Sequence, residues 1–250
     1  MKSILLTPLT KEVEIEYTQN LVQLSSERKN EIEEFWMEIN QDGLFHRGEV
    51  FNVDSLIEQE SLYKIMLNCT DYAHYLHTVR NHIADEEGCK VVFGAGLVET
   101  NDSKFVFGEM ANHTAYPGRL QCVGGGLSWD DKKGNHFDIK ESVLRELNEE
   151  LGIDYSKHIE KCTPVFLKSG GTYDFLVILY HIKLKIPQEE LIKHYQSFTE
   201  ILFTKGEKPE FQNVIYLENN REAITSFFEN DDRHCEDYLR PYLEEMTEQK

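Results

Sequence analysis

The feature that most constrains this 250-residue chain is an amphipathic helix predicted over residues 138–151. Ile139, Val143 and Leu147 recur at i, i+4 and i+8, which gives the helix one apolar stripe. Gly152 is the expected C-terminal stop, because glycine readily adopts the left-handed conformation that ends many helices. Such a stripe must be buried against another element, so the helix is expected to pack on the face of a sheet.

The last two turns of this helix carry three carboxylates, Glu146, Glu149 and Glu150. A helix places positions i, i+3 and i+4 on one face, where these charges repel one another unless they are solvated or share a cation. Hard divalent cations such as Mg²⁺ prefer oxygen ligands, which carboxylates one turn apart can supply. A solvated acidic face is the alternative interpretation.

The charge balance limits the partners. The chain has 45 acidic and 26 basic residues and a formal charge of −19. This balance repels polyanions, so neither a nucleic-acid polymer nor an anionic membrane surface is an expected partner. A small phosphorylated ligand is still compatible, because a bound metal reverses the field locally.

The remaining global features indicate a soluble, cytoplasmic protein. The five cysteines are scattered without a C-x-x-C pair, so neither a disulfide framework nor a cysteine zinc site is predicted. The apolar run near residue 1 is too short for a signal peptide. No window approaches the roughly 20 apolar residues of a membrane span.

The pattern of the chain changes at Asp85-Glu86-Glu87-Gly88, which predicts an N-terminal α/β extension over 1–87 and a second domain over 88–250. In the first part we expect one strand over residues 1–20, a helix from Ser25 to about Asn40, a short strand at Val50–Val53, and helices near 61–67 and 71–81. In the second part we expect a hairpin over 91–98 and 104–110 and a strand at Leu120–Val123. This strand runs into Gly124-Gly125-Gly126 and leads to the helix capped by Asp138 and Glu141.

Further strands are expected at 165–167, 173–184 and 214–217, and further helices over 187–197, 221–229 and 236–248. Strands and helices alternate without a repeating βαβ pattern, and some strands pair as hairpins. The fold class predicted is therefore α+β, a mixed sheet with helices on its faces.

The segment Arg145-Glu146-Leu147-Asn148-Glu149-Glu150-Leu151-Gly152-Ile153, preceded by Gly125 and a loop, resembles the Nudix box. All seven specified positions of the R-E-U-x-E-E-x-G-U half, in which U is aliphatic, are met. The resemblance covers about residues 88–220. It implies a Nudix-type α/β/α sandwich and metal-dependent hydrolysis of a nucleoside diphosphate linked to another moiety.

The resemblance also implies roles for individual residues. Glu146, Glu149 and Glu150 are the implied metal ligands, and the backbone carbonyl of Gly125 is a candidate fourth. Mg²⁺ is the implied cofactor, with Mn²⁺ as a substitute, and metal-bound water becomes a better nucleophile. Glu149 or Glu150 orients the attacking water, while Arg145 pairs with a carboxylate and holds the cluster. The residues that bind the substrate are not identified by any motif.

The loop half of the box departs from the family pattern. Phe137 stands where the family usually has a glutamate, eight residues before the arginine, and the loop after Gly125 is about six residues longer than usual. In the family that glutamate mainly organises the loop, and Asp138 or Glu141 are candidates to replace it. Asp130 and Asp131 are interpreted as part of a polar hairpin loop, because the position-12 glutamate of a calcium loop is missing.

Many members of the family take a further acidic residue from a late loop, for which Glu200, Glu207 and Glu210 lie in the right region. The turn at Lys168-Ser169-Gly170-Gly171-Thr172-Tyr173 could line a substrate pocket or be an ordinary turn.

The N-terminal patterns Leu44-Phe45-x-x-Gly48 and Asp71-Tyr72-x-x-Tyr75-Leu76 resemble the leader of a group that includes UDP-sugar diphosphatases. A UDP-sugar is therefore one predicted substrate, to be cleaved to UMP and a sugar 1-phosphate. ADP-ribose, dinucleotides and nucleoside triphosphates are alternatives, as is a Nudix-like module that binds a nucleotide without turnover. The acidic C-terminal helices are compatible with a homodimer.

Overall fold

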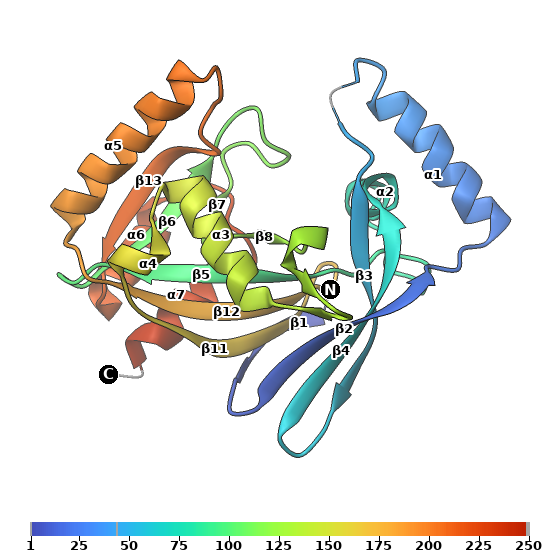
Figure 1. The fold of residues 1–250 in the computed structure, drawn as a ribbon, viewed down its shortest axis with the longest axis horizontal. Coiled ribbons are helices and arrows are strands. Elements are labelled where there is room, and N and C mark those ends of the chain that lie inside the picture. The colour runs from blue at the N-terminus through green and yellow to red at the C-terminus, as the bar shows by residue number, and fades with distance from the viewer. Residues whose placement is uncertain (1, 44, 249–250) are drawn as a thin grey trace.

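Two β-sheets organise this computed structural model, which describes residues 2–43 and 45–248 (Figure 1). Leu44, and with it part of one N-terminal pattern, lies outside the described residues. The large sheet has the order β1-β11-β12-β5-β6-β13, with β7 paired to β6 and β8 paired to β5. Its strands are β1 (Lys2–Pro8), β5 (Val92–Glu99), β6 (Lys104–Met110), β7 (Leu120–Gln121), β8 (Val123–Gly126), β11 (Ile159–Gly171), β12 (Leu176–Leu184) and β13 (Phe211–Glu218).

The small sheet has the order β3-β4-β2-β10-β9. Its strands are β2 (Glu12–Leu21), β3 (Glu49–Glu58), β4 (Leu62–Asp71), β9 (Lys132–Lys133) and β10 (His136–Phe137). The helices are α1 (Ser26–Ile39), α2 (Tyr72–Arg80), the 3₁₀ helix η1 (Trp129–Asp131), α3 (Ile139–Leu151), α4 (Tyr155–His158), α5 (Gln188–Thr204), α6 (Arg221–Asn230) and α7 (Leu239–Glu248). None of the described helices is both long enough and apolar enough to cross a membrane.

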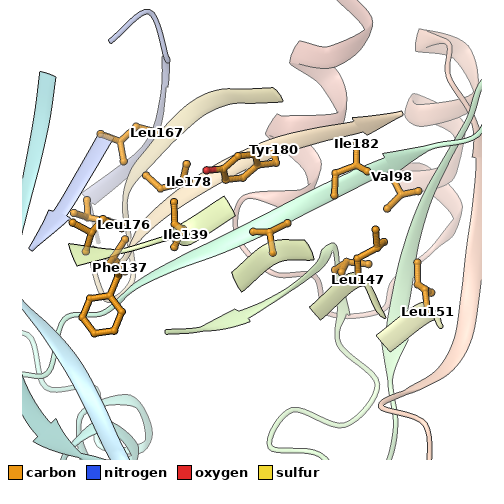
Figure 2. Close-up of a cluster of buried hydrophobic side chains, with 14 of the residues drawn as sticks. Val98, Phe137, Ile139, Leu147, Leu151, Leu167, Leu176, Ile178, Tyr180 and Ile182 are labelled. Carbon is orange, nitrogen blue, oxygen red and sulfur yellow. The ribbon is translucent and has the colours of Figure 1, made fainter. Parts of the chain in front are cut away.

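Helices cover both faces of the large sheet, because its central strands are apolar on both sides. On β12, Ile178, Tyr180 and Ile182 belong to the core cluster that contains α3, whose Ile139, Leu147 and Leu151 are drawn with them in Figure 2. The alternate residues Val177 and Leu179 belong to the second cluster, with α6 and α7. Since β5 pairs with β12 in parallel and with β6 in antiparallel orientation, the sheet is mixed. The predicted fold class, an α/β/α sandwich with a mixed sheet, is confirmed.

The two sheets exchange strands. β1, from the N-terminal part of the chain, pairs with β11 at the edge of the large sheet, in a register that aligns Leu5 with Ser169. In return, β10 pairs with β2 and thereby joins the small sheet. Phe137 of β10 belongs to the same core cluster as Phe51 of β3. The division of the chain at residue 87 stays a prediction. Each sheet contains strands from both sides of this residue.

Two sequence predictions for the N-terminal part were wrong. Residues 2–21 form two strands in different sheets rather than one strand, with a break between Pro8 and Glu12. The segment predicted as a helix near 61–67 is strand β4, whose buried residues are Tyr63, Ile65, Leu67 and Cys69. Burial at every second residue is the period of a half-buried strand, and it prevails over the short helical pattern.

Other predicted elements are confirmed, several with longer bounds. α1, α2, the β5–β6 pair and α3 lie where the sequence placed them. The strand expected at 165–167 extends over Ile159–Gly171, and the helix expected to end near 197 continues to Thr204. The cysteines are free thiols, as expected, and Cys69, Cys89 and Cys122 are buried.

Candidate active site

Helix α3 is capped at both of its ends and lies close to the sheet. Asp138 caps the N-terminus by accepting a hydrogen bond from the Glu141 backbone N–H at 3.1 Å, and Gly152 ends the helix with a φ of 70°. The helix packs directly on β5, because Gly94 has no side chain there. A Cβ at Gly94 would lie 2.3 Å from Val143 Cγ2, so any larger residue would push the helix away from the strand.

Glu150 is the most deeply buried of the three helix carboxylates, with 1% of the residue exposed. Its Oε2 accepts a hydrogen bond from the Gly124 backbone N–H at 2.9 Å, which ties α3 to β8. Burial raises the pKa of Glu150 well above its ordinary value, and the nearby charge of Glu146 raises it further. A carboxylate in this position is costly without a cation beside it.

Glu146 lies one turn earlier and faces the glycine run. A Cβ at Gly125 would lie 2.5 Å from Glu146 Oε1, so the side chain occupies the space that only glycine leaves free. Burial raises the pKa of Glu146 to about 7, although the charge of Arg145 opposes this rise.

Glu149 is half-exposed and its Oε2 accepts a hydrogen bond from Arg145 Nη1 at 2.8 Å. The same Nη1 lies 2.9 Å from Glu146 Oε1. Arg145 therefore stands between Glu146 and Glu149. These carboxylate oxygens are not among the ligand sets whose atoms all lie within 4.8 Å of one another in the described part of the chain. The two sets that do meet this distance are His158–Glu190–His194 and Glu14–Glu16–His136.

Among the three late acidic candidates, Glu210 is the one whose charge reaches the helix cluster. It precedes β13, and its charge raises the pKa of both Glu146 and Glu150. Desolvation and the charge of Glu149 raise the pKa of Glu210 in turn. Its backbone carbonyl accepts from Ala111 N at 2.7 Å, which fixes this segment against the end of β6. No local motif marks Glu210, so only the fold distinguishes it from Glu200 and Glu207.

The loop between β8 and α3 supplies a carboxylate that the sequence interpretation assigned only to a polar hairpin. Asp131 of η1 has only 4% of its residue exposed. Its Oδ1 and Oδ2 lie 3.4 and 3.3 Å from Arg145 Nε and Nη2. Asp138, one of the candidates for this place, instead caps α3 and pairs with Lys133 Nζ at 2.9 Å.

A cavity of about 520 Å³ borders the glycine run that contacts Glu146 and Glu150. The backbone of Gly124, Gly125 and Gly126 forms part of its wall, so the cavity and the carboxylate cluster share the glycine run. Aromatic side chains from both halves of the chain line the rest, and they include Tyr72, Tyr75, Tyr116, Tyr173, Phe175 and Tyr238. Lys168, Thr172 and Tyr173 are also part of the lining, so the Lys168–Tyr173 segment borders a pocket, although Lys168–Gly171 belong to strand β11 rather than to the predicted turn.

Several of these aromatic rings form a continuous stack. Phe175 lies 6.0 Å from Tyr75 and 5.3 Å from Tyr173 between ring centroids, with interplanar angles of 29° and 28°. The Tyr75 hydroxyl lies 2.9 Å from that of Tyr116, which fixes both rings. The Arg119 guanidinium stacks on Tyr116 at 3.8 Å from the ring centroid. A flat aromatic ligand could stack on these rings in the same way.

Two ion pairs lie in the cavity wall. Arg119 Nη1 lies 2.5 Å from Glu236 Oε2, and the buried Lys168 Nζ lies 2.8 Å from Asp237 Oδ2. Arg119 Nε and Asp237 Oδ1 are nevertheless buried without a hydrogen-bond partner in the described structure. One donor and one acceptor at this wall are therefore left for other groups to satisfy.

The sequence matches no protein-family model and no curated protein. Solved structures with similar backbones include a NUDIX-family hydrolase from Clostridium perfringens, which matches 64% of this chain and 97% of its own at 9% identity with a TM-score of 0.39. A NUDIX hydrolase from Nitrosomonas europaea matches 64% of this chain and 72% of its own at 12% identity with a TM-score of 0.40.

A bifunctional NMN adenylyltransferase/ADP ribose pyrophosphatase from Francisella tularensis, complexed with AMP and a Mn ion, matches 63% of this chain and 42% of its own. Its identity is 15% and its TM-score is 0.40. At such identities and scores, the chemistry of the present chain has to be argued from its own side chains.

Proposed function

We propose that this protein hydrolyses the phosphoanhydride bond of a nucleoside diphosphate linked to a second moiety, with divalent metal held at the end of α3. The observation that carries the proposal is the crowding of Glu146, Glu149 and Glu150 beside a glycine run that also forms the wall of an aromatic cavity. Carboxylates in a desolvated position, next to a site for a flat ligand, fit metal-assisted hydrolysis of a nucleotide better than they fit a solvated surface.

The donor set suits a hard cation. Glu150 is buried and Glu146 is partly buried, desolvation raises the pKa of both, and they offer oxygen ligands of the kind that Mg²⁺ and Mn²⁺ prefer. Glu149, Glu210 and the Gly125 carbonyl are the further candidate ligands. A metal bound here supplies positive charge to the phosphates and lowers the pKa of a bound water.

The protein side chains would divide the remaining work. Glu149 reaches solvent and can accept a proton from the attacking water, whereas Glu150 is buried and fixed by the Gly124 N–H. Water adds to phosphorus, the phosphoanhydride P–O bond breaks, and both phosphates leave as monoesters with release of a proton. Arg145 holds Glu146 and Glu149 on the same side of the helix.

The cavity suggests how a nucleotide is held. Its cations, Arg119 and Lys168, are already paired with Glu236 and Asp237, so they have little net charge to offer to a pyrophosphate. The pyrophosphate is therefore expected at the metal end, and the aromatic end around Tyr75 and Phe175 is left for the base. Stacking on an aromatic side chain contributes about 1–3 kcal/mol per base.

We infer a UDP-sugar as the first substrate to test, on the strength of the N-terminal patterns. Two residues of one pattern, Tyr72 and Tyr75, line the cavity, which supports a role for the leader in substrate binding. ADP-ribose, dinucleotides and nucleoside triphosphates have the same phosphate chemistry and belong in the same panel.

The test is to incubate the purified 250-residue protein with Mg²⁺ and each member of this panel, and to identify products by ³¹P NMR. We expect monoester products, UMP and a sugar 1-phosphate in the case of a UDP-sugar. Glu149→Gln should lower kcat by several orders of magnitude while the circular dichroism spectrum is unchanged, because the amide cannot accept the water proton.

The matched control is Glu222→Gln, which makes the same change at an exposed residue of α6 on the opposite face of the sheet and should keep the wild-type rate. If wild type turns over no substrate with Mg²⁺ or Mn²⁺, or if Glu149→Gln keeps full activity, the proposed function is wrong.

A further inference from the structure

The position at which the family usually has a glutamate is used here to join the two sheets. Phe137 is 6% exposed, and its ring lies 4.5 Å from that of Phe51 in the small sheet. Its backbone pairs with Ile15 of β2. Figure 2 shows Phe137 at one end of the row of core side chains, beside Ile139 and Leu176. A carboxylate at this position would be buried among aromatic rings, so the charge has to come from elsewhere in the loop.

Asp131 is the buried carboxylate that the lengthened loop brings in. Its Oδ2 accepts from the backbone N–H and the hydroxyl of Ser128, at 2.8 and 3.1 Å. Its own backbone carbonyl accepts from Asp138 N at 2.9 Å, directly before α3 begins. Ser128 therefore fixes the Asp131 carboxylate and Asp138 fixes its backbone, independently of any contact with Arg145.

The guanidinium of Arg145 has two separate sets of partners. Its Nε and Nη2 edge faces Asp131, while Nη1 contacts Glu146 and Glu149. A guanidinium has a rigid planar fork, so the contact along one edge determines where the other nitrogen stands. Nη1 already contacts Glu146 and Glu149, and without Asp131 the Nε and Nη2 edge would be free to turn to the same two carboxylates.

We propose that Asp131 takes the place of the missing box glutamate and is the positioning residue that occupies Nε and Nη2 of Arg145, so that only Nη1 is left to compete with metal for Glu146 and Glu149. This inference rests on the proposed function for the identity of the metal ligands. The loop thereby serves two purposes. Phe137 packs against the small sheet at the position of the family's glutamate, and Asp131 provides a carboxylate for Arg145 in place of that glutamate.

The test measures metal binding rather than turnover. Free Mn²⁺ is followed by electron paramagnetic resonance during titration of the wild type, Asp131→Asn and the control Asp130→Asn. Asp130 is the exposed neighbour of Asp131, so the control removes the same charge from the same short helix. We expect Asp131→Asn to weaken Mn²⁺ binding about 10- to 100-fold, the usual effect of losing a partner of a ligand shell, and Asp130→Asn to bind like wild type.

A double-mutant cycle with Arg145→Gln separates positioning from a general loss of charge or of loop structure. If Asp131 acts through Arg145, adding Asp131→Asn to Arg145→Gln should leave the Mn²⁺ Kd unchanged, because no cation remains to compete. Equal weakening in both backgrounds overturns the proposal, as does wild-type affinity in Asp131→Asn.

Folding of each variant is checked by circular dichroism and urea unfolding. If Asp131→Asn does not fold, Ser128→Ala removes one hydrogen bond to the same carboxylate and should weaken Mn²⁺ binding in the same direction by a few-fold. The two proposals can fail separately. A wild type that binds Mn²⁺ but turns over nothing refutes the hydrolase function alone, and an active wild type with a fully competent Asp131→Asn refutes the role of Asp131 alone.

Discussion

Glu109 and Glu150 are both buried carboxylates beside the same large sheet, and their surroundings are opposite. Glu109 on β6 accepts from Gln212 at 2.6 Å, Asn213 at 2.9 Å and Arg233 at 2.6 Å. Burial alone would raise its pKa, but these hydrogen bonds outweigh burial and hold the pKa below its ordinary value. Glu150 has one backbone N–H and the charges of Glu146, Glu149 and Glu210 nearby, and its pKa is raised.

The opposite pKa shifts indicate that ionised Glu109 stabilises the folded state, whereas ionised Glu150 destabilises it. Three donors around Glu109 replace the water it loses on burial, so its charge is compatible with the native state. At Glu150 the surroundings add negative charge instead. A protein keeps such a cluster at a cost in stability, which a bound cation can recover. Three substitutions test this contrast through the free energy of unfolding.

The largest effect is expected at Glu109. Glu109→Gln should lower the free energy of unfolding by about 2–4 kcal/mol, because the amide keeps the volume but removes the charge that three donors share and leaves Arg233 with Asp231 as its remaining carboxylate partner. Urea unfolding at pH 8 in EDTA measures the change. A loss below about 0.5 kcal/mol would mean that the hydrogen bonds around Glu109 do not stabilise the protein.

The same isosteric change at Glu150 should have the opposite sign. Without metal at pH 8, Glu150→Gln should raise the free energy of unfolding by about 1–3 kcal/mol, since it removes a buried and crowded charge. The folded-state pKa lies above the unfolded one, so the cost of Glu150 grows as pH rises above about 4.5. The advantage of the variant should therefore shrink toward pH 4.5.

Saturating Mg²⁺ should also remove the advantage of Glu150→Gln, because only wild type gains the full stabilisation from binding. A variant that is less stable than wild type in EDTA would contradict the contrast with Glu109.

The smallest change in the free energy of unfolding is expected at Asp174. This carboxylate is partly exposed and, like Glu109, forms ion pairs with basic side chains. Its Oδ2 lies 2.8 Å from Lys2 Nζ and 2.9 Å from Lys90 Nζ, and Oδ1 accepts from Gly170 N at 2.9 Å. Burial opposes ionisation, but these partners lower the pKa of Asp174 from 3.8 to about 2. After allowance for solvent screening, this shift corresponds to about 1–2 kcal/mol of stability at neutral pH.

Because the folded-state pKa is the lower one, this contribution is present above pH 3.8 and is lost as pH falls toward 2. Asp174→Asn should therefore be less stable than wild type at pH 7, and the gap should narrow below pH 4. Asparagine tolerates the positive φ of 53° at this position, so the backbone is kept. A gap that is independent of pH would show that the charge of Asp174 is not responsible.

Local patterns were sufficient for the elements whose signals lie within a few residues. The apolar stripe of α3, its Asp138 cap and its Gly152 stop are all short-range, and each was predicted correctly. Strand partners were not predictable in this way. Nothing in residues 2–21 indicates that the first strand pairs with β11 and the second with β4, since partners so distant in sequence leave no local signal.

The same limit applies to the candidate site. The three glutamates of α3 were identified because they are neighbours on one helix. Asp131 and Glu210 reach them from separate loops and were not separable from other acidic residues by sequence. What distinguishes Asp131 is that it is buried and lies within hydrogen-bonding reach of Arg145 on the next helix. Both properties depend on the three-dimensional fold and cannot be recognised from local sequence. The cavity likewise depends on aromatic residues from both halves of the chain.

The pairing of β1 with β11 has a consequence for the order in which the protein can be completed. Leu5 is aligned with Ser169, so the partner of β1 is made more than 160 residues after β1 itself. At about 5–20 residues per second, the wait is on the order of 10–30 s. Throughout that interval the backbone of β1 lacks the strand that satisfies it in the native sheet. Synthesis rate and chaperone access during this interval should therefore influence the yield of native protein.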